Sequence, residues 1–201
     1  MPNGTPETPH TEPPLLILGG TFDPPHVGHL VLAECARAQL GARKVVFIPA
    51  GDPYRKSDRA VSSAQHRLAM LRLAVAGNPA FAIDERELRR EGPTYTVDTL
   101  EELRAEGHEH IVLVLGADAV ADMPHWKQPD RIRELATLAV APQDQQPPAP
   151  PWNLVVDMPP VSISSTLIRR RAASAKPIRY LVSDSVARYI AEHGLYRPPA
   201  P

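Results

Sequence analysis

Residues 15–29 read LLILGGTFDPPHVGH, and this stretch decides the fold. Residues 15–18 form a short apolar run that predicts a buried β-strand, and the glycines at 19–20 follow it directly. We expect the backbone to turn sharply at these glycines and to let a ligand approach closely, because a side chain would obstruct both. His26 and His29 then begin a helical pattern. A strand, a glycine turn and a helix in this order indicate the start of an α/β unit.

Short apolar runs alternate with amphipathic helical patterns along the rest of the chain. The predicted strands are residues 15–18, 44–48, 81–83, 111–115, 138–141 and 154–156, of which 81–83 has the weakest pattern. The predicted helices are residues 28–40, 62–76, 96–106, 165–173 and 183–193, the last ending at Gly194 as its C-cap. This alternation predicts a single-domain α/β fold with a Rossmann-like, doubly wound parallel sheet. Ligands bind such sheets beyond the carboxyl ends of the strands, where the strand order reverses.

The composition excludes several classes of protein. The chain has 201 residues and 43% hydrophobic content, which fits one globular domain. Lys and Arg number 22 against 23 Asp and Glu, so no charge excess favours nucleic acid or an acidic membrane surface, and any phosphate must be held locally. The single cysteine excludes an intrachain disulfide and a multi-cysteine zinc site, which agrees with a cytoplasmic location. We expect neither a signal peptide nor a membrane span.

The 24 prolines mark the expected ends of the domain. They cluster at residues 2–14, 142–160 and 198–201, and proline disfavours both helix and sheet interiors. We therefore expect disordered tails at residues 1–13 and 198–201, a folded domain at residues 14–197, and an exposed loop at 143–151.

The loop after the first strand has the properties of an anion site. His26 and His29 are expected on one side of the first helical turn, beside unpaired N–H groups and the positive end of the helix dipole. Histidine adds an N–H donor that can be cationic near neutral pH. The alternative is that both are surface histidines without a functional role. A zinc site lacks suitably spaced Cys or acidic ligands, and neither GxGxxG nor a Walker motif occurs.

The stretch GGTFDPPHVGH at residues 19–29 resembles the signature of the nucleotidyltransferases that carry a His-x-Gly-His motif, in particular the bacterial nicotinate-mononucleotide adenylyltransferases. These enzymes transfer an adenylyl or cytidylyl group from a nucleoside triphosphate and release pyrophosphate. The resemblance implies catalytic roles for His26 and His29. It implies ATP contacts for the residues between them and the strand, Gly20, Thr21 and Phe22.

A second stretch, ISSTLIR at residues 163–169, has the features of a phosphate-binding segment. Its serines suit a helix N-cap, and Arg169 lies one turn along, where its planar fork can reach the same anion. An ordinary serine-capped helix with a solvated arginine is the alternative reading. The resemblance implies ATP-phosphate contacts for Ser164, Ser165, Thr166 and Arg169.

The loop after the second strand holds a lysine that the resemblance also assigns to ATP. Residues 49–56 read PAGDPYRK, and Lys56 stands where many family members have the lysine of Pro-His-Lys. The family's histidine is replaced by Arg55, so it stays open whether Arg55 contacts a phosphate.

The stretch EGPTYTVDTL at residues 91–100 predicts a helix start. Thr94 or Thr96 can cap the helix. The family pattern is Gly-Pro-Ser-Tyr-Thr-x-Asp-Thr-Leu, with Thr94 in place of serine. The resemblance implies that Thr94, Tyr95 and Thr96 bind the nicotinate ring and its carboxylate through backbone N–H groups. Free N–H groups at a helix start suit a carboxylate better than a neutral amide.

The remaining family positions follow the strand predicted at residues 111–115. The resemblance places Gly116 and Asp118 along the nucleotide and stacks Trp126 on the pyridine ring, although packing at the surface is an alternative for Trp126. The runs at residues 66–70 and 189–196 also resemble the family, and we interpret both as scaffold.

The resemblance covers about residues 15–196 and implies one reaction. ATP and nicotinate mononucleotide would give nicotinate adenine dinucleotide and pyrophosphate, a step of NAD synthesis, with Mg²⁺ bound to ATP and no dedicated metal site on the protein. Two alternatives stay open: another phosphorylated acceptor, such as nicotinamide mononucleotide, or a non-catalytic nucleotide-binding module. We expect no nucleic-acid or membrane partner, and the oligomeric state, which includes a homo-oligomer, is left open.

Overall fold

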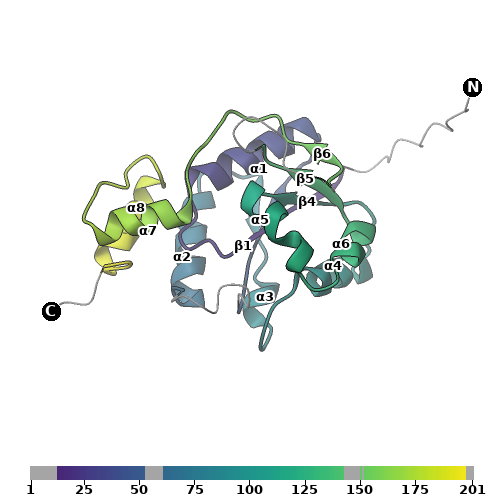
Figure 1. Ribbon diagram of the computed structural model, residues 1–201, viewed down its shortest axis with the longest axis horizontal. Helices are drawn as coiled ribbons and strands as arrows, with labels where there is room; N and C mark the ends of the chain where they lie inside the picture. Colours follow the sequence, from purple (N-terminus) through teal and green to yellow (C-terminus); the bar gives the residue numbers. More distant parts are fainter. Residues whose placement is uncertain (1–12, 53–60, 143–149, 151, 198–201) are drawn as a thin grey trace, which may run out of the picture.

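The computed structural model describes residues 13–52, 61–142, 150 and 152–197, and its centre is one parallel sheet (Figure 1). Six strands pair in the order β3-β2-β1-β4-β5-β6, and every pairing is parallel. The strands are β1 Leu15–Gly20, β2 Val45–Pro49, β3 Phe81–Ile83, β4 Ile111–Leu115, β5 Thr137–Val140 and β6 Leu154–Val155. The order reverses between β1 and β4, as in a doubly wound fold, which confirms the predicted fold class.

Helices cover both faces of this sheet. The helices of the described ranges are α1 Val27–Gln39, α2 Ala64–Val75, α3 Arg86–Arg89, α4 Thr96–Ala105, α5 Ala117–Asp122, the 3₁₀ turn η2 Met123–His125, α6 Pro129–Leu135, α7 Ser165–Ala173 and α8 Asp184–Glu192. One buried cluster joins α1 and α2 to Leu16 and Leu18 of the central strand. A second cluster joins α4, α5 and α6 to Ile17 of the same strand. Alternate residues of one strand therefore enter opposite cores, which explains its uninterrupted apolar sequence.

The last part of the chain packs against α2 rather than on the sheet. A long segment after β6 leads to α7 and α8, which lie together beside α2 (Figure 1). We call residues 165–197 the C-terminal lobe. It shares a third buried cluster with α2, made of Met70, Ile168, Val182, Val186 and Ile190. Helix α8 ends at Glu192, one residue before the predicted end, and its C-cap is His193 rather than Gly194, which follows the cap with a φ of 59°.

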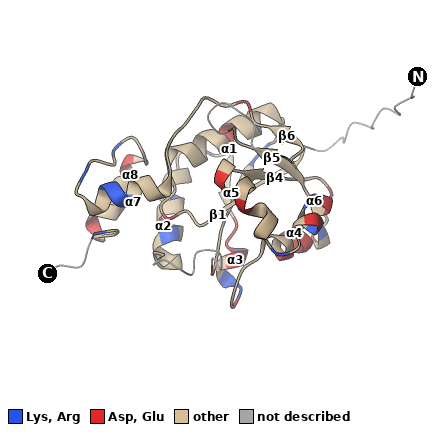
Figure 2. Ribbon diagram, viewed as in Figure 1, with Lys and Arg blue, Asp and Glu red and all other residues tan. Residues whose placement is uncertain are grey.

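The C-terminal lobe is basic although the whole chain is nearly neutral. It holds seven Lys and Arg against two Asp and Glu. Figure 2 shows basic residues along α7, whereas α4 and α6 carry both signs. The balanced total charge therefore conceals a local positive region.

Four short elements were not predicted from the sequence: α3, α5, η2 and α6. Each is shorter than eight residues, too short for a helical period to show. The predicted tails, except residue 13, and the predicted loop, except Pro150, lie outside the described residues. None of the helices in the described ranges is long and apolar enough to cross a membrane.

Candidate active site

The predicted phosphate loop, residues 19–29, leaves the carboxyl end of β1 beside the point where the strand order reverses; we call it the opening loop. Its turn differs from the prediction. The glycines end β1 itself, and the left-handed backbone lies at Phe22, with a φ of 51°. A side chain at Gly20 would meet the Phe22 ring at 3.0 Å. Gly20 therefore allows the Phe22 ring to pack closely against the backbone, and it does not itself turn the chain.

The two histidines form a stacked pair at the start of α1. His26 is the N-cap and His29 the third helical residue, and their ring centroids lie 3.7 Å apart. The backbone N–H of His26 donates to Nδ1 of His29 across 3.1 Å. Because Nδ1 accepts, the proton of a neutral His29 ring lies on Nε2. A side chain at Gly28 would lie 3.0 Å from Nδ1 of His26, so the glycine between the histidines permits the stacking.

His26 is buried, and burial disfavours the cationic form that a histidine can adopt near neutral pH. Only 9% of the residue is exposed, and burial lowers its pKa to about 4. Its Nδ1 is buried and has no hydrogen-bond partner among the described residues. Burial thus favours the uncharged form of this imidazole, which can donate one hydrogen bond to a phosphate.

The second stretch predicted to bind phosphate, residues 163–169, contacts the opening loop directly. Ser164 is the N-cap of α7, and its hydroxyl accepts from the N–H of Leu167 across 3.1 Å. The hydroxyl of Ser165 donates to the carbonyl of Pro24 across 2.9 Å. The Ser165 hydroxyl thus uses its proton within the protein, whereas the Ser164 hydroxyl, which only accepts, keeps its proton to donate. The backbone N–H groups of the first turn of α7 are left to attract an anion.

Arg169 links the same two stretches. One guanidinium nitrogen donates to the carbonyl of Asp23 across 2.8 Å, and the other donates to the hydroxyl of Thr166 across 3.1 Å. The Arg169 guanidinium thus makes one hydrogen bond to the opening loop and one to its own helix, α7. The fold brings residues 163–169 against the opening loop, as the phosphate hypothesis requires.

The predicted nicotinate stretch lies at the start of α4, and its cap differs from the prediction. Tyr95 is the N-cap, without a side-chain cap hydrogen bond, and Thr96 is the first helical residue. Thr94 is buried, and its N–H and hydroxyl both donate to the carbonyl of Asp52, across 3.2 and 3.4 Å. Lys127 lies 4.5 Å from the centre of the Tyr95 ring. No serine or threonine hydroxyl therefore caps the first turn of α4.

The residues predicted after β4 lie on the face of the sheet that carries α4. Gly116 is the N-cap of α5, and Asp118 is exposed in the first turn of that helix. Trp126 is half-buried, and its indole N–H donates to the carboxylate of Asp122 across 3.1 Å. Trp126 and Tyr95 pack against the same buried cluster. Arg55 and Lys56 lie outside the described residues.

Arg67 was interpreted as scaffold, but it organises the edge of the site. It is 1% exposed and donates to the carbonyls of Thr21, Ala50 and Gly51 across 3.0, 2.6 and 2.8 Å. Burial lowers its pKa, while the negative charge of Asp23 opposes that shift. Arg67 thereby ties together the segments that follow β1 and β2. The signal in the sequence was an arginine within the apolar run of residues 66–70.

Gly51 is also required by packing. A side chain there would lie 2.1 Å from the carbonyl oxygen of Glu87, which real atoms do not tolerate. Glu87 is buried and accepts from the Thr99 hydroxyl across 2.7 Å, and burial raises the pKa of this carboxyl. The loop after β2 is thus seated directly on α3.

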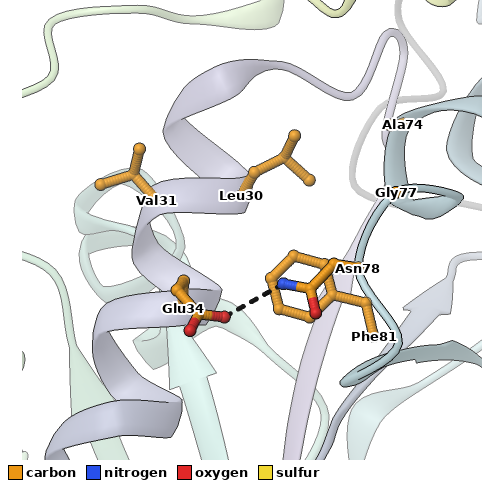
Figure 3. A pocket seen from close by; sticks show the side chains of 7 residues that line it. All are labelled: Leu30, Val31, Glu34, Ala74, Gly77, Asn78 and Phe81. Atoms are coloured by element: carbon orange, nitrogen blue, oxygen red, sulfur yellow. Dashed lines mark hydrogen bonds between the residues drawn. The ribbon is translucent and has the colours of Figure 1, made fainter.

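A hollow of about 300 Å³ lies elsewhere, between α1 and the end of α2 (Figure 3). Its walls are mostly apolar, and Asn78 donates to Glu34 at one side across 3.1 Å (Figure 3). Figure 3 shows Leu30 and Val31 of α1 at the opposite side from Ala74 and Gly77. None of the predicted site residues lines this hollow.

Comparison with known proteins places the chain among nucleotidyltransferases. The family model described as cytidylyltransferase-like matches residues 17–171. The probable nicotinate-nucleotide adenylyltransferase of Roseiflexus sp. (strain RS-1) is 43% identical over 195 residues, covering 92% of this chain and 98% of the relative. That of Thermomicrobium roseum is 46% identical over 193 residues, covering 90% of each chain.

Solved structures share the fold. Plasmodium falciparum nicotinic acid mononucleotide adenylyltransferase complexed with NaAD has a TM-score of 0.76 at 17% identity, covering 92% of this chain and 98% of that one. A putative nicotinate-nucleotide adenylyltransferase from Vibrio parahaemolyticus has a TM-score of 0.70 at 18% identity, covering 92% and 96%. At these identities the likeness concerns the fold alone.

Proposed function

The chain belongs to the cytidylyltransferase-like family, and from this premise we propose that it is a nicotinate-nucleotide adenylyltransferase. It transfers AMP from ATP to nicotinate mononucleotide and yields nicotinate adenine dinucleotide and pyrophosphate. The observation that carries the proposal is the junction of the opening loop with α7. Ser165 and Arg169 donate to the carbonyls of Pro24 and Asp23, so two stretches that each suit a phosphate form one site.

The reaction is an in-line displacement that needs no nucleophile from the protein. An oxygen of the mononucleotide's 5′-phosphate forms a bond to the α-phosphorus of ATP. The bond from that phosphorus to the oxygen bridging the α- and β-phosphates breaks, and its electron pair leaves with pyrophosphate. Because the attacking group is already an anion, catalysis consists of positioning and of stabilising charge.

The stacked histidines donate to the reacting phosphate. His29 carries its proton on Nε2 when neutral, since its Nδ1 accepts from the backbone. A neutral imidazole donor lowers the energy of charge that develops on the α-phosphate and the bridging oxygen. His26 stacks on this ring and is held uncharged by burial, which makes it a hydrogen-bond donor of fixed orientation.

The start of α7 holds the β- and γ-phosphates. Its backbone N–H groups, the helix dipole and Arg169 are the local positive features beside the opening loop. We assign ATP contacts to Gly20, Thr21, Phe22, Lys56, Gly116, Asp118, Ser164, Ser165, Thr166 and Arg169. The N–H groups of Ser164, Ser165 and Thr166 act there together with the hydroxyl proton of Ser164, because the Ser165 hydroxyl donates to Pro24.

The start of α4 binds the nicotinate group. The Tyr95 side chain makes no capping hydrogen bond to the first turn, so the backbone donors of that turn suit an anionic carboxylate. We assign this role to Thr94, Tyr95 and Thr96, with Trp126 against the pyridine ring. A neutral amide gains less from the helix dipole, which is the physical reason to prefer nicotinate over nicotinamide.

Mg²⁺ is proposed to enter with ATP. The described ranges contain no group of three or more His, Cys, Asp or Glu side chains arranged to hold a metal ion. Mg²⁺ commonly keeps several waters and binds through substrate phosphates, so this protein suits it without a cage of its own. When bound, it neutralises phosphate charge and favours the departure of pyrophosphate.

Three further properties stay predictions: a cytoplasmic location, the absence of a nucleic-acid or membrane partner, and an oligomeric state that is open to a homo-oligomer. The first two follow from the composition, and none of the three affects the chemistry proposed above.

The first test is pyrophosphate release from Mg-ATP, with nicotinate mononucleotide and nicotinamide mononucleotide assayed side by side. The proposal expects a kcat/KM at least about tenfold higher for the acid. Comparable rates would keep the adenylyltransferase but contradict the role of the α4 start. If neither acceptor gives pyrophosphate while ATP still binds, the chain is a nucleotide-binding module or uses another acceptor, and the proposed function is wrong.

A further inference from the structure

Tyr196 follows α8, and its side chain turns back toward the opening loop. Its hydroxyl donates to Oδ1 of Asp23 across 2.7 Å, joining positions 173 residues apart in the chain. The sulfur of Met70 lies 3.8 Å from the same hydroxyl. Burial, followed by the negative charge of Asp23, raises the pKa of Tyr196. The phenol therefore keeps its proton at neutral pH and remains a donor.

Asp23 is fixed through both its main chain and its side chain. It is 1% exposed and lies in the opening loop, shortly before His26. Its carbonyl accepts from Arg169 across 2.8 Å, and its carboxylate accepts from the backbone N–H of Ser62 across 3.4 Å as well as from Tyr196. The C-terminal lobe thus holds this residue from two separate points.

The opening loop needs such anchors because its backbone is unusual. Phe22, next to Asp23, has a φ of 51°, which a bulky side chain rarely adopts unless the surrounding structure holds it. The ring of Phe22 meets the His29 ring edge-on, with centroids 5.1 Å apart. A shift of Asp23 would therefore be transmitted through Phe22 to the histidine pair.

We propose that Tyr196 is a positioning residue for adenylyl transfer, which acts through its hydrogen bond to Asp23 and keeps His26 and His29 in line with the α-phosphate. The inference rests on the proposed function of the site. Tyr196 touches no reacting group, and its whole effect passes through the geometry of the opening loop.

Tyr196 could contribute to stability alone, and this role must be distinguished from positioning of the opening loop. Tyr189 provides the matched control. Tyr189 of α8 also joins the C-terminal lobe to α2, because its hydroxyl lies 2.9 Å from Nδ1 of His66. The variant Tyr189→Phe removes one hydroxyl and one hydrogen bond between the lobe and the rest of the protein. It does not touch the opening loop, whereas Tyr196→Phe does.

The experiment compares Tyr196→Phe, Tyr189→Phe and the unchanged protein in full-length form. For Tyr196→Phe we expect kcat to fall about tenfold or more, with KM for nicotinate mononucleotide within about threefold, since small misplacement mainly affects the transition state. Tyr189→Phe should keep kcat within about twofold. Both variants should lose a similar amount of thermal stability, because each loses one hydrogen bond. An unchanged kcat in Tyr196→Phe, or equal losses in both variants, would overturn the proposal.

Hydrogen exchange gives a second readout that does not depend on activity. Peptides that cover residues 19–29 should exchange at least about tenfold faster in Tyr196→Phe than in Tyr189→Phe. Equal exchange in this segment would overturn the proposal even if both variants were active. If the unchanged protein releases no pyrophosphate, the proposed function fails, while the exchange comparison still decides whether Tyr196 fixes the loop.

Discussion

At the scale of single residues, the histidine pair is defined by what its two rings can donate. His29 accepts a backbone hydrogen bond at Nδ1, while His26 is buried and uncharged. The sequence predicted that both residues lie on one side of a helix start, and the 3.7 Å stacking confirms it. The lost charge of His26 could not be predicted, because burial of a loop residue depends on segments distant in sequence.

His29→Ala removes the Nε2 donor and should lower kcat by about 10²- to 10⁴-fold. The binding of ATP and nicotinate mononucleotide should change little, because the lost hydrogen bond matters most in the transition state. Steady-state and single-turnover kinetics measure the effect. A variant that retains near-full kcat would remove His29 from the mechanism.

Burial of His26 should also make stability depend on pH. Its pKa is lowered from 6.5 to about 4, so between these values the unfolded chain binds a proton that the folded chain does not. The free energy of unfolding should therefore fall as the pH drops from about 6.5 toward 4, by up to about 3 kcal/mol from this group.

The measurement is urea unfolding of the unchanged protein and of His26→Asn at pH 7.5 and pH 5. The loss between the two pH values should be smaller in the variant, because asparagine does not titrate. If the unchanged protein and the variant lose the same stability between pH 7.5 and pH 5, His26 takes up a proton as readily in the folded protein as in the unfolded chain.

At the scale of elements, two helices of the C-terminal lobe begin with equivalent caps. The Ser164 hydroxyl accepts from the N–H of Leu167 at the start of α7, and the Ser183 hydroxyl accepts from the N–H of Val186 at the start of α8. The start of α7 contacts the opening loop through the Ser165 side chain, whereas the segment before α8 contacts it through the backbone carbonyl of Leu181, which accepts from the N–H of Val27 across 3.0 Å.

Ser164→Ala and Ser183→Ala should each cost about 1 kcal/mol of stability, the usual loss for an N-cap. Only Ser164→Ala should also raise KM for ATP, since it disturbs the N–H groups proposed to face the phosphates. Thermal unfolding and initial rates at varied ATP concentration test both statements. A similar rise of KM in Ser183→Ala would indicate that lobe stability, and not the start of α7, controls ATP binding.

The sequence predicted the strands better than the caps. All six strands were predicted within two residues, because a strand buried on both faces must be apolar throughout. The start of α4 was misjudged, since Thr94 uses its hydroxyl on Asp52 and leaves Tyr95 as the N-cap. Contacts between distant segments decide such details, and the role of Tyr196 was missed for the same reason.

At the scale of the whole molecule, the sequence predicts a domain that occupies residues 14–197. A chain limited to these residues should keep its melting temperature within about 2 °C and its kcat/KM within about twofold, because the described core and site lie inside these bounds.

A chain that ends at Leu195 is the control, since it lacks only Tyr196 and Arg197 of the domain. It should lose at least about tenfold in kcat. A 14–197 chain that melts much lower than the unchanged protein would show that the domain bounds are wrong.

The hydrogen bond between Tyr196 and Asp23 has a consequence for biosynthesis. The opening loop is translated early, and its phenolic anchor follows 173 residues later. At ordinary elongation rates this separation lasts about 10–35 s. Throughout that interval the histidines exist on a nascent chain without the contacts that hold their loop. A product terminated before Tyr196 would therefore contain both histidines and still be a poor enzyme, so activity reports that translation has passed Tyr196.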